Sequence, residues 1–178
     1  MEKILSQDAQ LSKRLRVAEN PGLLRTIAMV FAHSGDSWFW LMGILLVWFS
    51  KDPYWKSLAL IFGISVGITA VLVLTIKFTV KRQRPEGDWG EIYRSSDPHS
   101  FPSGHAARSF MLAVLAVGLG PDWFAIIMVI WAPLVGLARV AMGVHYLSDV
   151  IAGALIGILM GWINLNLIPA AMGYLAAL

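Results

Sequence analysis

Uncharged, apolar stretches alternate with short polar segments along most of the chain and predict five hydrophobic elements. The clearest is residues 57–76, twenty uncharged residues, about the length that a helix needs to cross ~30 Å of hydrocarbon. The others cover residues 37–50, 102–120, 123–138 and 145–178. The run at 37–50, between Asp36 and Lys51, is short for a span unless it extends back through Phe31. All five are expected to be helices, because lipid offers backbone groups no hydrogen-bonding partners.

The N-terminal segment, residues 1–35, has a different pattern. Within residues 3–18 the apolar positions share one helical stripe with basic residues beside it: Ile4, Leu11, Leu15 and Ala18 against Lys13, Arg14 and Arg16. This pattern predicts an amphipathic helix lying in the membrane interface, with a solvated tail as the alternative. The predicted fold is an all-α polytopic membrane helix bundle, with about five transmembrane helices plus this N-terminal helix, in a single domain over residues 1–178.

The composition supports a membrane protein. Hydrophobic residues make up 57% of the chain and charged residues 14%, against roughly 25% charged in an ordinary soluble domain. Cysteine is absent, which excludes a disulfide framework and a thiolate metal site. The net charge of +3 comes mostly from the N-terminal segment and one central loop, a pattern typical of basic edges on a membrane body. We therefore expect no nucleic-acid partner.

Glycines within the predicted spans recur four residues apart, at Gly63 and Gly67 and again at Gly153, Gly157 and Gly161. Small residues at this spacing let membrane helices approach closely. We therefore expect tight helix packing at these positions.

Alternating membrane crossings bring polar residues from three separate stretches to one face of the bundle. Counting crossings from Asp36 onward, the residues on this face are Lys77, Arg84, His105, Arg108, Arg139, His145 and Asp149. Ionisable residues at membrane depth are costly and usually functional. The topology thus predicts a functional site there.

Lys77, Arg84 and Arg139 are three of the cations in this set. Together they match a dianionic phosphoryl group and the charge that develops as it is transferred. Ser103 and Gly104 open the third predicted helix, where free N–H groups and the positive end of the helix dipole favour an anion. These residues predict a cradle for phosphate.

The two histidines supply the reactive groups. His145 and Asp149 are four residues apart and share one helix face, so the carboxylate can fix the tautomer and leave the other ring nitrogen free to attack phosphorus. His105, from a different helix, can protonate the departing oxygen. The cluster predicts covalent phosphoryl transfer with no metal and no other cofactor. Arg108, one turn after His105, either contacts the substrate head group or reaches the interface.

The same residues resemble the signature of the type 2 phosphatidic acid phosphatase superfamily. The matching segments are Lys77-x6-Arg84-Pro85, Pro102-Ser103-Gly104-His105 and Arg139-x5-His145-x3-Asp149, which place the catalytic motifs within residues 77–149. The resemblance implies that His145 is the nucleophile, that Asp149 orients it and that His105 protonates the leaving group. It also implies a set of phosphate-binding residues: Lys77, Arg84, Ser103, Gly104 and Arg139. One departure is Ala138, where the family usually has a small hydroxyl residue.

Together these features predict an integral multi-pass protein of the plasma or inner membrane that hydrolyses a lipid phosphate or diphosphate. Candidate substrates are undecaprenyl diphosphate, phosphatidylglycerol phosphate, phosphatidate and a lipid A phosphate. A lipid phosphotransferase and a transporter with a charged pathway are the alternatives. The positive-inside rule favours a cytosolic site, whereas cell-envelope relatives usually act on the outer side, so both orientations stay open. The oligomeric state is not predicted.

The loop between the first two motifs carries four acidic residues, Glu86, Asp88, Glu91 and Asp97. We expect a solvated acidic face there, with a metal site as the alternative.

Overall fold

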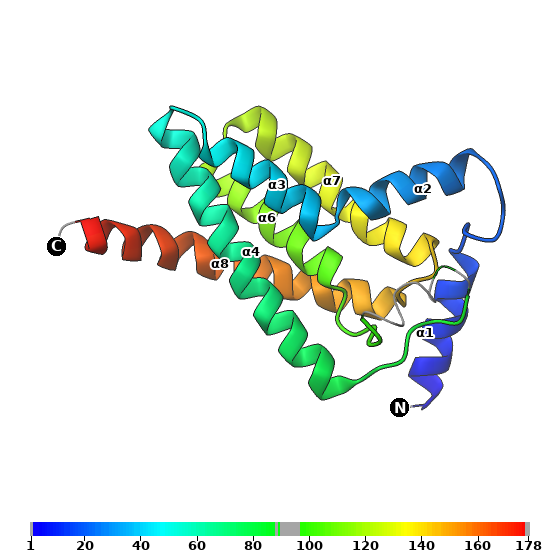
Figure 1. The fold of residues 1–178 in the computed structure, drawn as a ribbon. Helices are drawn as coiled ribbons and strands as arrows, with labels where there is room; N and C mark the ends of the chain where they lie inside the picture. Colours follow the sequence, from blue (N-terminus) through cyan, green and yellow to red (C-terminus); the bar gives the residue numbers. More distant parts are fainter. Residues whose placement is uncertain (1, 88, 90–96, 177–178) are drawn as a thin grey trace.

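The chain folds into a bundle of helices. The computed structural model describes residues 2–87, 89 and 97–176, and this part of the chain forms seven helices (Figure 1). They are α1 (Glu2–Arg14), α2 (Leu23–Ser34), α3 (Ser37–Trp48), α4 (Pro53–Val80), α6 (Gly104–Leu119), α7 (Asp122–Ala141) and α8 (Leu147–Ala176). β-Structure among these residues is limited to one isolated bridge between Gln83 and His99. The predicted all-α fold is confirmed.

Helices α4, α7 and α8 are long and apolar enough to cross a membrane, and the bent pair α2–α3 makes a fourth span if it crosses as one unit. Large apolar side chains face outward on these helices, among them Val71, Ile126 and Leu155, each at least 60% exposed. Exposed apolar surface of this extent suits contact with lipid. Among the described residues, the remaining apolar helix of the about five predicted spans is α6, which has 16 residues and is shorter than this measure requires.

The first predicted span is interrupted. The apolar run at residues 37–50 was predicted to be short for a span unless it extends back through Phe31. In the structure α2 ends at Ser34 and α3 begins at Ser37, and the two helices are bent by 54° relative to each other. Neither helix contains a proline, but Gly35 ends α2 and Asp36 stands in the N-cap position of α3, residue types that are typical of a helix end and a helix start.

Side chains from other helices compensate the backbone groups that the break leaves open. Arg108 of α6 donates to the carbonyl oxygen of Gly35. Trp40 Nε1 donates to the carbonyl oxygen of Ser34 at 3.1 Å, and Trp131 Nε1 of α7 donates to the hydroxyl of Ser34 at 2.9 Å. Open carbonyl groups at membrane depth need such partners, so the break is a defined structural feature.

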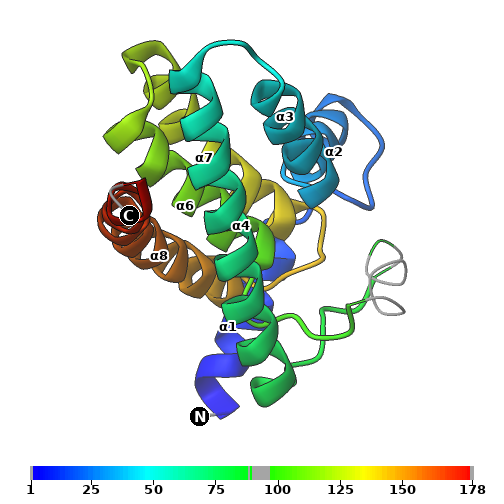
Figure 2. The same cartoon turned by 60° about the vertical axis from the view of Figure 1, so that its left-hand side comes forward.

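The short helix α6 lies at the centre of the bundle, with α4, α7 and α8 packed around it (Figure 2). Met111, Leu112 and Leu115 on α6 are fully buried. The helix begins where the Ser103 hydroxyl accepts from the backbone N–H of Ala106, the usual arrangement of an N-cap. Ser103 itself is buried, so the start of α6 lies inside the protein.

Close packing at the glycines of α8 is confirmed. A Cβ at Gly153 would lie 2.5 Å from the carbonyl oxygen of Ser103, and one at Gly157 would overlap the carbonyl oxygen of Ala107. This spacing lets the backbone of α8 approach the backbone of α6. The prediction is wrong for Gly67 on α4, where a Cβ would meet no atom within 4 Å.

The N-terminal segment contains two helices of different character. The amphipathic helix expected over residues 3–18 forms as α1, although it ends at Arg14. The rest of the segment predicted at residues 1–35 includes the apolar helix α2, which packs against α7.

Helix α1 lies across the start of α8 (Figure 1). The hydroxyl of Ser12 accepts from the backbone N–H of Leu147 at 2.9 Å, and Asp8 Oδ1 accepts from the backbone N–H of Ser148 at 3.1 Å. The first N–H groups of a helix have no partner within the helix itself. Helix α1 therefore caps the helix that carries Asp149.

Candidate active site

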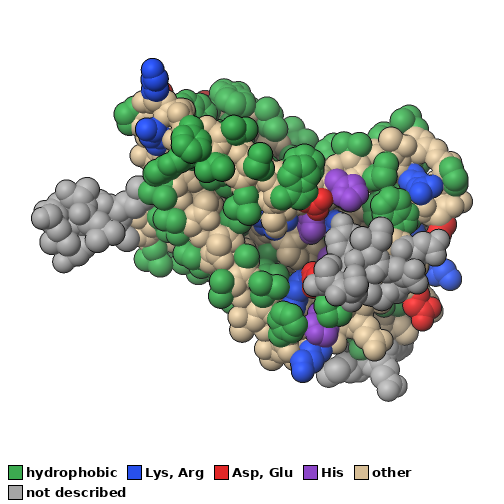
Figure 3. Space-filling view, viewed as in Figure 1, with side chains coloured by type: hydrophobic (Ala, Val, Ile, Leu, Met, Phe, Trp, Pro, Cys, Tyr) green, Lys and Arg blue, Asp and Glu red, His purple; other side chains and the backbone are tan. Residues whose placement is uncertain are grey.

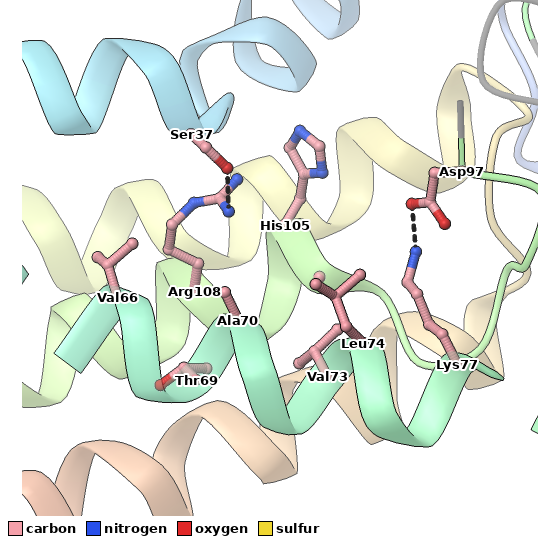
Figure 4. Close-up of a pocket in the computed structure, with 11 residues that line it drawn as sticks. Ser37, Val66, Thr69, Ala70, Val73, Leu74, Lys77, Asp97, His105 and Arg108 are labelled. Carbon is pink, nitrogen blue, oxygen red and sulfur yellow. Dashed lines mark hydrogen bonds and ion pairs between the residues drawn. The ribbon is translucent and has the colours of Figure 1, made fainter. Parts of the chain in front are cut away.

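A cavity of about 200 Å³ lies between α3, α4 and the start of α6 (Figure 4). Its polar lining includes Lys77, Asp97, His105 and Arg108. The adjoining wall is apolar and comes from Val66, Ala70, Val73 and Leu74 of α4. In the space-filling view, histidines and charged side chains gather in one hollow beside hydrophobic surface (Figure 3). The cavity thus joins a charged pocket to an apolar wall.

His145, in the turn between α7 and α8, is 1% exposed and is held from both sides. Its Nε2 lies 3.2 Å from Arg84 Nη1, and its Nδ1 lies 3.5 Å from Asp149 Oδ2. Arginine can only donate, so Nε2 is the acceptor and the ring proton sits on Nδ1, toward Asp149. The distance to Asp149 exceeds an ordinary hydrogen bond, and catalytic contacts of this kind often tighten when substrate binds. The lone pair of Nε2 is directed to the cationic side of the site.

The surroundings of His145 keep its imidazole neutral. Burial is the largest cause that lowers its pKa well below the usual value of about 6.5. The charges of Arg84, Arg139 and Lys77, and the nearby His105, lower the pKa further. A neutral imidazole retains the electron pair that a nucleophile needs.

Lys77 and Arg84 share one anion, the side chain of Asp97. Lys77 Nζ donates to Asp97 Oδ2, and Arg84 Nη2 donates to the same oxygen at 2.8 Å. Both cations are nearly fully buried. The carboxylate thus occupies a position suited to one oxygen of a phosphoryl group, which shows that the two cations can bind a single anion together.

The remaining predicted phosphate-binding residues surround the same site. Arg139, in the last turn of α7, is 1% exposed, and its charge acts on His145. Gly104 lines the cavity at the start of α6. The backbone N–H of Ser103 donates to the carbonyl oxygen of Asp149 at 2.9 Å, which joins the start of α6 to α8. The predicted residues therefore converge on one region, while their roles stay predictions.

A comparison with protein families matches the PAP2 superfamily over residues 58–172, well over half of the chain. The chain belongs to the PAP2 superfamily. The matched range contains all three sequence motifs that carry the histidines and the cations.

Relatives within PAP2 act on lipid-linked phosphates according to their names. Lipid A 4'-phosphatase of Bacteroides thetaiotaomicron is 32% identical over 139 residues, which cover 71% of this chain and 62% of the relative. Undecaprenyl-diphosphatase of Sulfolobus acidocaldarius is 33% identical over 142 residues, which cover 76% of this chain and 66% of the relative. The chain therefore spans less than two thirds of either relative.

Two solved PAP2 structures share the fold. A transmembrane PAP2-type phosphatidylglycerolphosphate phosphatase from Bacillus subtilis has a TM-score of 0.74 at 26% identity, covering 92% of this chain and 85% of that chain. LpxE from Aquifex aeolicus has a TM-score of 0.69 at 26% identity, covering 88% of this chain and 93% of that chain. Both similarities extend over most of this chain, so the fold is that of a membrane PAP2 protein.

Arg82 contacts the PAP2 site from within the first motif, at one of its unspecified positions. Its Nη1 donates to Asp149 Oδ1 at 2.6 Å and its Nη2 donates to Asp8 Oδ2 at 2.7 Å. Burial would raise the pKa of Asp8, but hydrogen bonds from Ser148 and Arg82 outweigh it and hold the pKa below its ordinary value. Asp8 is therefore an anion at neutral pH. Sequence reasoning did not assign Arg82 to the site, because it lies between the two specified residues of the motif, Lys77 and Arg84.

Asp36 contacts His105, the second of the two histidines predicted to be catalytic. Its Oδ1 lies 2.7 Å from His105 Nε2, at the break between α2 and α3. Sequence reasoning used Asp36 only as the boundary of a span. One signal was available: Asp36 is the lone acidic residue between Asn20 and Lys51, within an apolar region where an ionisable group is costly.

Two of our other expectations fit the structure less well. Arg108 lines the cavity, yet its guanidinium donates to Ser37 Oγ at 2.7 Å and to the carbonyl oxygen of Gly35 (Figure 4). It is therefore engaged with the helix break, and its contact with a head group stays a prediction. Asp97 binds two cations where we expected a solvated acidic face. Asp88 and Glu91 of that loop lie outside the described residues.

Proposed function

We propose that this PAP2 protein hydrolyses a lipid phosphate or diphosphate through a phosphohistidine on His145. The observation that carries the proposal is the setting of that imidazole. It is buried, its pKa is lowered, and its two nitrogens face Arg84 and Asp149. This arrangement supports a neutral imidazole as the nucleophile, with the Asp149 carboxylate at Nδ1 and the Arg84 guanidinium at Nε2.

The reaction then has two steps. The Nε2 lone pair of His145 forms a bond to phosphorus while the bond between phosphorus and the ester oxygen breaks. His105 gives its proton to that oxygen, and the lipid alcohol leaves. In the second step water attacks phosphorus, its proton passes to His105, the bond between phosphorus and Nε2 breaks, and inorganic phosphate is released. Both imidazoles return to their starting states.

Lys77 and Arg84 are well suited to hold the phosphoryl oxygens during both steps. Their shared contact with the Asp97 carboxylate supports this role, since substrate phosphate would replace that carboxylate. Arg139 adds a third buried positive charge, and the positive dipole end of α6 lies at the cavity, which Gly104 lines. Fixed charges and dipoles of this kind stabilise the charge that develops as the phosphoryl group is transferred.

The apolar wall of the cavity supports a substrate with a hydrocarbon tail. Val66, Ala70, Val73 and Leu74 of α4 lie beside the charged pocket (Figure 4). A lipid phosphate bound there can keep its tail against α4 and its phosphate beside Lys77. The Asp97 carboxylate that Lys77 binds also contacts Arg84, which in turn contacts His145. The classes to test are phosphatidylglycerol phosphate, polyprenyl diphosphate, phosphatidate and lipid A phosphate, in a protein of the plasma or inner membrane.

The experiment measures phosphate release by the purified protein from this panel of lipids in detergent micelles, with EDTA present. We expect release from at least one lipid, and a drop of at least about 10³-fold in His145→Ala with lipid phosphate still bound. His99→Ala is the matched control, because the side chain of His99 contacts the ring of Phe78. The control should keep wild-type activity.

Quenching the reaction in alkali after mixing with ³²P-labelled lipid should leave label on wild-type protein and none on His145→Ala. Phosphate release that survives the His145 substitution, or activity that collapses in EDTA, would refute the scheme. Adding acceptor lipids and analysing the products distinguishes hydrolysis from phosphoryl transfer to another lipid.

A further inference from the structure

Two aspartates occupy the same position at the start of neighbouring helices but make different contacts. Asp52 precedes α4, and its Oδ1 accepts from the backbone N–H of Tyr54 at 2.8 Å. This is the ordinary role of aspartate at an N-cap. Asp36 precedes α3 in the same extended conformation, yet its side chain accepts no backbone N–H of that helix. Its carboxylate is therefore available for other partners.

Both oxygens of Asp36 face imidazole rings. Oδ1 lies 2.7 Å from His105 Nε2, and Oδ2 lies 3.1 Å from His33 Nδ1. The side chain of His105 is 17% exposed and that of His33 is 46% exposed. An ionised carboxylate only accepts, so the pairing places a proton on His105 Nε2 and leaves Nδ1 as the nitrogen that exchanges protons.

The helix break fixes Asp36 in this position. Arg108 donates to Gly35 O on one side of Asp36 and to Ser37 Oγ on the other. Gly35 permits the approach, because a Cβ there would lie 2.7 Å from Val135 Cγ1 and 3.1 Å from His105 Cδ2. The carboxylate is thus held in place before substrate binds.

We propose that Asp36 is the positioning residue for His105 in the phosphatase reaction: it fixes the ring tautomer and stabilises the imidazolium form that protonates the leaving group. The proposal rests on the proposed function. It gives each catalytic histidine its own aspartate, Asp149 for His145 and Asp36 for His105. In the first step the proton moves from His105 Nδ1 to the ester oxygen, and in the second step Nδ1 takes a proton from water. Asp36 stays ionised throughout.

The positive charges around His105 make it necessary that Asp36 stabilises the protonated form of this histidine. Arg108 on the same helix, Arg139 on α7 and Lys77 on α4 all lie near His105, with Asp36 and Asp97 as the nearby acids. Cations close to an imidazole oppose its protonation, whereas a hydrogen-bonded carboxylate favours it. Asp36 therefore offsets the charges that bind phosphate. Its effect is largest for phosphomonoesters of alcohols, because an alkoxide needs a proton to leave, and smallest for leaving groups that depart as stable anions.

The test compares two substrates with the same hydrocarbon tail, an alkyl phosphate and an aryl phosphate with a nitrophenolate leaving group. The measured quantity is kcat/KM, which reports steps up to departure of the leaving group. For Asp36→Asn we expect a loss of about 10²-fold or more on the alkyl phosphate and less than about tenfold on the aryl phosphate. Asp52→Asn, the same change at an N-cap, should leave the ratio of the two kcat/KM values at its wild-type value.

An equal loss on both substrates, or no loss on either, overturns the proposal, since a purely structural contact cannot depend on the leaving group. If Asp36→Asn fails to fold, Asp36→Ser provides the same comparison with a smaller side chain. Failure of the proposed function would be distinct: wild-type protein would then release phosphate from neither substrate. Asp36→Glu, which restores a carboxylate, should recover part of the lost ratio.

Discussion

Removing the guanidinium of Arg82 tests whether a residue outside the specified motif positions orients the nucleophile. In Arg82→Ala the fully buried carboxylate of Asp149 loses its 2.6 Å charge-assisted hydrogen bond, and Asp8 loses one of 2.7 Å. The hydrogen bond from the backbone N–H of Tyr146, 2.9 Å from Asp149 Oδ2, and the one with the Ser100 side chain stay in place. The substitution leaves a buried negative charge with less compensation.

The size of the effect follows from these contacts. A hydrogen bond to a charged group contributes about 1.5–3 kcal/mol. If Asp149 must hold His145 in the transition state, that loss corresponds to a decrease in kcat/KM of roughly 10- to 200-fold, at about 1.36 kcal/mol per tenfold. Breaking a buried ion pair by removing one partner costs about 3–5 kcal/mol of stability, so the unfolding temperature should fall as well.

The assay is phosphate release from the best lipid substrate in micelles, alongside thermal unfolding in the same detergent. Lys81→Asn is the matched control, because Lys81 is an exposed neighbouring cation whose φ of 52° asparagine tolerates. The control should stay within twofold of wild type in both measurements. Wild-type kcat/KM in Arg82→Ala, or an equal loss in the control, would show that Arg82 does not position Asp149.

Three further outcomes are expected. Asp97→Asn should lower the inhibition constant of inorganic phosphate up to about tenfold in a competition assay, because the Asp97 carboxylate no longer competes with phosphate for Lys77 and Arg84. An unchanged inhibition constant would argue against competition between this carboxylate and phosphate. Gly157→Ala should destabilise the protein by about 1–3 kcal/mol in thermal unfolding, because the added Cβ overlaps the carbonyl oxygen of Ala107. Gly67→Ala is the control: its added Cβ meets no atom within 4 Å, so the substitution should be neutral or slightly stabilising. The pKa of His145 is lowered, so its neutral, nucleophilic form persists as the pH falls through 6.5, and kcat/KM should decline only well below that pH. A decline of kcat/KM on the acid side that begins at or above pH 6.5 would contradict the lowered pKa.

Motif spacing and the alternating membrane crossings predicted which residues lie together at the candidate site, because both can be counted along the sequence. His145 and Asp149 are four residues apart at the start of one helix, and the apolar runs between motifs fix which ends meet. The contacts of Asp36 and Arg82 were not predictable in this way. The partner of Asp36 is 69 residues away, and the partner Asp8 of Arg82 is 74 residues away.

The fold was predicted in class but not in the details of its helices. The apolar run before residue 50 has no proline to mark a break, and the bend at Gly35 depends on hydrogen bonds from α6 and α7. Helix α6 is shorter than a full span, because it begins at a serine N-cap inside the bundle. The start of α6 at Ser103 and Gly104 was predicted from the sequence, whereas the 54° bend between α2 and α3 was not.

The break between α2 and α3 also has a consequence for biogenesis. These two helices of 12 residues each leave the ribosome more than fifty residues before Arg108, which closes the open carbonyl of Gly35. Until then the exposed carbonyl and the charge of Asp36 disfavour transfer of this bent helix pair into hydrocarbon. The N-terminal helices therefore gain a stable place in the bilayer only when α6 arrives, so insertion of the first span and assembly of the catalytic pocket are completed together.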